Sequence, residues 1–126
     1  MPERTYRTNR DLVVWRTGVG LTNLVYHQTK SFPHTEQFGL TSQMRRAAVS
    51  IPANIAEGAA RGSQKEFLRF LYISRGSLCE LGTLTDVAHN TGSLTAVARD
   101  ELRAMINTES ALFNGLIRVI RIKANS

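Results

Sequence analysis

Apolar residues recur every three or four positions in four separate segments of this chain, and no stretch alternates long enough to propose a strand. A spacing of three and four residues places side chains on one face of an α-helix, and that face must be buried. Short connections containing glycine or proline separate the segments, so consecutive helices are expected to run antiparallel. The pattern predicts an all-α, antiparallel, up-down four-helix bundle.

The chain is expected to form one domain. Its 126 residues are typical of a single hydrophobic core. We predict a polar lead-in over residues 1–10 and the bundle over residues 11–123, with Asn9 or Asp11 capping the first helix. The sequence has no long apolar run for a signal peptide or membrane span, and its one cysteine excludes an intrachain disulfide. A cytoplasmic location is therefore expected.

Two local signals define the middle helices. Pro52 falls inside the second apolar pattern, where it lacks an N–H and its ring clashes with the Ala48 carbonyl. We predict a proline kink in helix 2; the alternative is a break, with Ser50 capping a new helix. Ser63 and Glu66 have the spacing of a capping box, which predicts the start of the third helix.

No pattern of residues indicates catalysis or a cofactor. The three histidines lie in different predicted segments, and none is spaced three or four residues from another metal-type ligand. Cys79 stands beside Leu78 and Leu81, which favours a buried cysteine acting as a small apolar side chain over a nucleophile. No phosphate-binding glycine loop is present. We expect no enzyme activity, no metal and no cofactor.

The charge balance indicates an anionic partner. The formal net charge is +6, which favours a polyanion such as nucleic acid, although a generally basic surface is the alternative. Residues 41–80 contain six lysines and arginines and only three acidic residues. Near the C-terminus a second basic cluster has another explanation, since cations in a last turn are stabilised by the helix dipole. That cluster is Arg118, Arg121 and Lys123.

Helix 2 carries a continuous polar stripe at spacings of three and four residues. The stripe is either part of a groove that holds phosphates or a solvated face or polar network between subunits, and spacing alone favours the second. The nucleic-acid-binding candidates are Arg45, Arg61, Lys65, Arg69 and Arg75. The candidates for a buried structural network are Arg46, Ser50, Asn54 and Glu57.

The stretch TSQMRRAAVSIPANIAEGAARGSQKEFLRFLYISRGSLCEL, with DLVVW and KSFPHTEQFGL before it, resembles a known family. Its members are four-helix bundle proteins encoded by intervening sequences in bacterial 23S ribosomal RNA genes. They are related to the accessory variability proteins of diversity-generating retroelements. The likeness covers roughly residues 9 to 88 and is stronger to the ribosomal branch. Gly18, Gly20, Ser74 and Gly82 depart from the usual family residues.

The resemblance implies a homopentamer around a central opening and no enzyme activity. For the retroelement branch it implies a basic surface that binds RNA and a partner reverse transcriptase. For the ribosomal branch, no molecular function is established. The expected function is that of a non-enzymatic oligomer binding RNA through a basic surface; the alternative is a protein-interaction scaffold with incidental basic charge.

Overall fold

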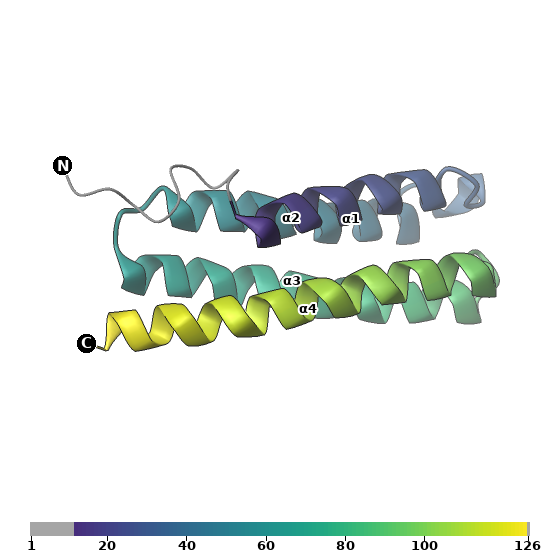
Figure 1. Cartoon of the computed structure of the whole chain (residues 1–126). Coiled ribbons are helices and arrows are strands. Elements are labelled where there is room, and N and C mark those ends of the chain that lie inside the picture. The colour runs from purple at the N-terminus through teal and green to yellow at the C-terminus, as the bar shows by residue number, and fades with distance from the viewer. Residues whose placement is uncertain (1–11, 126) are drawn as a thin grey trace.

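Four long helices lie side by side along one axis (Figure 1). The computed structural model describes residues 12–125. In chain order the elements are α1 (Val13–Thr29), the short 3₁₀ helix η2 (His34–Glu36), α2 (Leu40–Ala59), α3 (Gln64–Asn90) and α4 (Ala96–Ala124). Across this described range no residue is in a strand. The predicted all-α four-helix bundle is confirmed.

The bundle has two ends with different connections (Figure 1). The turn between α2 and α3 lies at one end, beside the C-terminal end of α4. The connections from α1 to α2 and from α3 to α4 lie at the other end. Each helix therefore runs antiparallel to its sequence neighbour, as short links require.

The predicted apolar stripes meet in one core. Leu21, Met44, Leu71 and Phe113 represent the four helices there, and each side chain is completely buried. Not every apolar residue of the stripes faces the core: Val97 is 80% exposed. Its neighbour Ala98 is buried instead, because α4 begins only at Ala96 and its first turn presents Ala98 to the core.

Helix α3 begins where predicted, directly after a residue whose side chain caps it. Ser63 Oγ accepts a hydrogen bond from the Glu66 N–H at 3.1 Å, which confirms this N-cap. α1 begins at Val13, later than predicted, and Leu12 gives it no side-chain cap. The expected caps Asn9 and Asp11, like the lead-in at 1–10, lie outside the described residues.

Helix α2 continues through Pro52 as one element. The alternative of a break capped by Ser50 is wrong, because Ser50 Oγ donates to the Ala47 carbonyl at 2.7 Å. Pro52 cannot donate to the Ala48 carbonyl, and Thr22 Oγ1 of α1 lies 3.0 Å from that oxygen as a donor. The hydroxyl of a neighbouring helix thus lies in place of the missing N–H, and it shares its single proton between this carbonyl and the Gly18 carbonyl at 2.9 Å. The kink at Pro52 stays a prediction.

Small residues let the helices approach one another closely around Pro52. A Cβ on Gly18 would lie 2.9 Å from Glu109 Oε2 and 3.6 Å from the Pro52 Cβ. From α3, Ser74 Oγ donates to the Ile51 carbonyl at 2.6 Å. All four helices therefore meet at one position along the bundle. We call this position the central level and define it by Gly18, Pro52, Ser74 and Glu109.

Glu109 is a carboxyl group inside the apolar core. Its side chain is completely buried, and neither oxygen has a hydrogen-bond partner among residues 12–125. Burial raises the pKa of Glu109 to about 8, because removal from water disfavours the charged form. The core thus holds a side chain whose charge state depends on pH near neutrality.

Candidate nucleic-acid interface

The central level divides the described residues into two halves of different charge. The half that contains the α2–α3 turn and the C-terminal end of α4 has only two acidic residues, Glu57 and Glu66. Arg75 lies next to the central level, and its guanidinium reaches into this half to Asn114. The basic residues of this half are Arg16, Arg61, Lys65, Arg69, Arg75, Arg118, Arg121 and Lys123. We call it the basic half.

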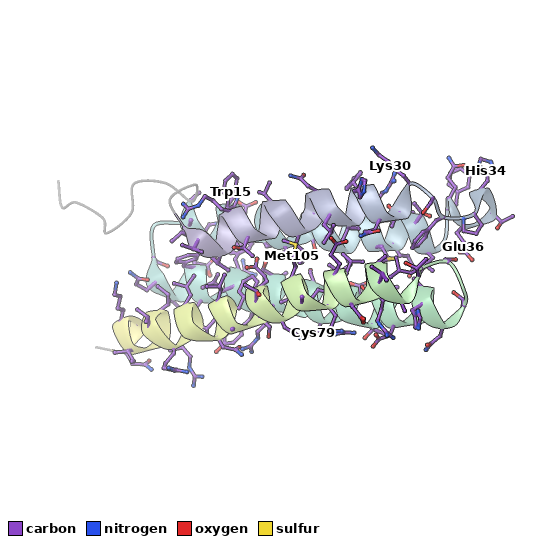
Figure 2. The ribbon with its side chains drawn as sticks, turned by 45° about the vertical axis from the view of Figure 1, so that its right-hand side comes forward. Trp15, Lys30, His34, Glu36, Cys79 and Met105 are labelled. Atoms are coloured by element: carbon purple, nitrogen blue, oxygen red, sulfur yellow. The ribbon has the colours of Figure 1, made fainter. Side chains whose placement is uncertain are left out.

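The other half, called the neutral half, has equal numbers of charges of both signs. Its basic residues are Lys30, Arg45, Arg46, Arg99 and Arg103. Its acidic residues are Glu36, Glu80, Asp86, Asp100 and Glu101. Figure 2 shows Lys30, His34 and Glu36 at the outer end of this half. Between residues 12 and 125 the whole surplus of positive charge therefore lies on the basic half.

The structure brings together four of the five predicted binding residues. Arg61, Lys65 and Arg69 lie about the α2–α3 turn, and Arg75 lies further along α3. Lys65 is exposed and forms no ion pair with any described residue. The turn and the start of α3 therefore present the predicted cations on the basic half.

Arg45 does not belong to this group. It lies on the neutral half, where its Nε donates to Thr29 Oγ1 at 2.9 Å. Its guanidinium carbon also lies 4.6 Å from the centre of the Tyr26 ring. Arg45 therefore connects α2 to the end of α1, which is a structural role.

The predicted polar network is only partly formed. Asn54 Nδ2 donates to the Ser50 carbonyl at 2.8 Å, a contact within α2. Arg46 was expected to be buried with Glu57, but its side chain is exposed. Glu57 instead lies 3.4 Å from Arg61. These residues form a solvated helix face, because a long arginine side chain on that face reaches water more easily than the core.

Aromatic rings hold three of the basic side chains. The Arg61 and Arg69 guanidinium carbons lie 5.0 Å and 4.5 Å from the Phe70 ring centre. Arg75 lies 5.1 Å from the Tyr72 ring centre. Cation–π contacts fix a guanidinium without using its N–H donors. The ring contacts therefore leave these donors available to an anion, apart from the donors that contact Glu57, Glu66 and Asn114.

Two ion pairs between described residues of this half are exposed. Arg61 and Glu57 have side chains that are 46% and 55% exposed, and Arg69 pairs with Glu66 at 3.3 Å in a similar setting. Exposed pairs of this kind contribute little free energy. A phosphate can therefore compete with these carboxylates for both arginines.

Sequence reasoning missed a groove between α3 and α4 on the basic half. The groove has a volume of about 390 Å³. Arg75 lines it from α3, and Asn114, Arg118, Arg121 and Asn125 line it from α4. Arg118 and Arg121 were attributed to the helix dipole, and spacing along one helix could not show that Arg75 faces them.

Cys79 also differs from expectation. It was predicted to be buried, but it is exposed on α3, and Figure 2 shows it on an outer side of the bundle. Leu78 and Leu81 take the inward positions instead.

Within residues 12–125 no three His, Cys, Asp or Glu side chains are placed to hold a metal ion. No helix in that range is long and apolar enough to cross a membrane.

Comparison with known proteins agrees with the fold. The chain has a TM-score of 0.78 and 20% sequence identity to the crystal structure of a protein of unknown function from Bacteroides thetaiotaomicron, of the S23 ribosomal protein family. The match covers 84% of this chain and 96% of that one. No curated protein matches the chain. The model of the 23S rRNA-intervening sequence protein family matches residues 10–115. The chain therefore belongs to the family of 23S rRNA-intervening sequence proteins.

Proposed function

We propose that this protein is a non-enzymatic, homo-oligomeric helical bundle that binds RNA through its basic half, in the cytoplasm. The observation that carries the proposal is the separation of charge. Eight basic residues lie on one half with two acids, whereas the other half has no surplus. A one-sided positive surface attracts and orients a polyanion.

RNA is the polyanion we favour, for two reasons. The family's name associates its members with an intervening sequence of 23S rRNA. Six of the eight basic residues are arginines, whose fork of N–H donors matches phosphate oxygens. Contacts to phosphates carry little sequence information, so we propose weakly sequence-specific binding.

The first test is a titration of fluorescently labelled single-stranded RNA with the whole protein at several salt concentrations. If about four phosphates are neutralised, affinity should fall about fiftyfold between 50 and 200 mM salt, because each contact releases counterions. The proposal fails if the assembled protein binds no RNA at the lowest salt concentration. That outcome would favour the alternative, a protein-interaction scaffold with incidental basic charge.

We also propose assembly as a homopentamer. The resemblance to pentameric relatives suggests the number, and exposed apolar side chains support self-association. The largest exposed fractions among them belong to Phe38 at 89%, Val97 at 80%, Ile122 at 65% and Val13 at 52%. Such side chains favour burial against another chain. A reverse transcriptase is a further partner suggested by the retroelement relatives.

Light scattering tests the assembly. The expected mass is five times the 14.0 kDa of one chain. A dimer would refute the stoichiometry alone. A monomer at micromolar concentration would refute self-association, and the basic half of one chain would then have to bind RNA by itself.

A further inference from the structure

We propose that the groove between α3 and α4 is a binding site for a chain of linked phosphate groups, running along the C-terminal part of α4. This inference rests on the proposed RNA binding and deepens it, since it assigns one track for the phosphodiester backbone. The same chemistry could bind a free inorganic polyphosphate, so the experiment below compares both ligands.

The groove presents hydrogen-bond donors to a ligand. Arg75, Arg118 and Arg121 converge on it from two helices, and no carboxylate of residues 12–125 lines it. A guanidinium has five N–H donors and no acceptor. Ile117 is 3% exposed and lies at the groove as well, so part of the wall is apolar. A ligand that satisfies this set must be an anion with several oxygens.

Asn114 completes the donor set because of its contact with Arg75. Arg75 Nη1 donates to Asn114 Oδ1 at 3.2 Å. Since a guanidinium can only donate, the carboxamide oxygen must face it. The Asn114 NH₂ group is then left to donate to another acceptor. Asn114 therefore positions Arg75 across the groove and offers two donors of its own.

The spacing along α4 favours a linear ligand over a single ion. Asn114, Arg118, Arg121 and Asn125 follow one another by four, three and four residues, one helical turn each. Side chains at these spacings are roughly 5–6 Å apart. The row spans three turns, which is longer than one phosphate ion. A chain of phosphates can contact each turn in succession.

The helix dipole does not explain this arrangement. It favours cations only in the last turn of a helix, which accounts for Arg121 and Lys123. Arg75 belongs to a different helix, and Asn114 lies more than two turns before the end of α4. Convergence of these groups on one groove requires a separate reason, and a phosphate chain supplies it.

The sharpest variant is Asn114→Asp, because it has nearly the same shape and keeps an acceptor for Arg75. It replaces two donors by a negative charge inside the groove, so anions should be repelled while the fold is retained. The matched control is Asn107→Asp, seven residues earlier on α4. Asn107 is also exposed and lines a different groove, beside Asp86 and Arg103.

Two ligands are titrated into the wild type and both variants: inorganic tripolyphosphate and a labelled single-stranded RNA. NMR of the arginine Nε–Hε groups should show tripolyphosphate shifting Arg75, Arg118 and Arg121 in the wild type. Asn114→Asp should abolish those shifts and weaken RNA binding about tenfold, the loss of one charge-assisted hydrogen bond. Asn107→Asp should change RNA affinity less than twofold.

The outcomes separate the two proposals. If the wild type binds RNA but Asn114→Asp binds it equally well and tripolyphosphate shifts none of the three arginines, the groove proposal is overturned and RNA binding survives. If tripolyphosphate binds in the groove and RNA does not bind at all, the groove holds a free polyphosphate and the proposed RNA function is contradicted. Arg118→Gln repeats the test without adding an acid, in case Asn114→Asp does not fold.

Discussion

Replacing Glu109 by glutamine is expected to remove most of the pH dependence of stability between about pH 5 and 8. In the wild type, burial raises the pKa of Glu109 from 4.5 to about 8. Between these two values the folded protein keeps a proton that the unfolded chain has released. The free energy of unfolding therefore falls as pH rises, by up to about 1.4 kcal/mol per pH unit.

Stability falls as pH rises because burial raises the pKa of Glu109. The contribution of the protonated Glu109 is fully present below the unfolded pKa and is lost as pH rises through the folded pKa. Above that pH the folded core must hold a carboxylate whose two oxygens have no donors. Glutamine keeps a similar shape and cannot ionise, so its stability should stay nearly constant over the same range.

Urea denaturation at pH 5, 6.5 and 8, at one protein concentration, measures this effect. The matched control is Glu101→Gln, an exposed position on the same helix, and this variant should follow the wild type. A further variant, Glu109→Leu, should be more stable than the wild type at pH 8, because it removes a buried group without partners. Equal slopes for the wild type and Glu109→Gln would contradict the assignment.

The signal for Glu109 was present in the sequence. Buried residues of α4 recur at spacings of three and four, and position 109 falls in that series between Ile106 and Phe113. A charged residue at position 109 interrupts the apolar stripe when residue type alone is considered. The periodic spacing nevertheless places this position on the buried face of α4. Gly18 carries the complementary signal, because only a residue without a side chain leaves room for the Glu109 carboxyl group.

The helices themselves could be predicted well because their signals are local. Apolar spacing fixes the buried face of each helix, and the Ser63 cap fixes the start of α3. The start of α1 was harder to predict, because Leu12 supplies no side-chain cap. The exposure of Cys79 and Arg46 depends on how each helix is rotated against its neighbours, and a sequence pattern limits that rotation only loosely.

The candidate interface depended on contacts between distant segments. The α2–α3 turn keeps Arg61 and Lys65 together because they are close in sequence. Arg75 and Asn114 are 39 residues apart, and nothing in either segment alone indicates that they meet. The same holds for Arg45, whose contact with Thr29 removed it from the predicted group.

Reversing two charges on the basic half is expected to weaken RNA binding by about a hundredfold. Lys65→Glu with Arg121→Glu removes two phosphate contacts, each worth about tenfold. Both side chains are exposed and neither forms an ion pair with a described residue, so the fold should be retained. The matched control is Lys30→Glu with Arg46→Glu, which makes the same charge change on the exposed surface of the neutral half.

The salt dependence of RNA binding by these two variants distinguishes a localised interface from general basic charge. The slope of log affinity against log salt should become shallower by about 1.4 for Lys65→Glu with Arg121→Glu, the contribution of two contacts to a single strand. It should stay within error of the wild-type slope for Lys30→Glu with Arg46→Glu, whose affinity should change less than about threefold. Equal losses in both variants, or the larger loss in the neutral-half variant, would contradict binding through the basic half.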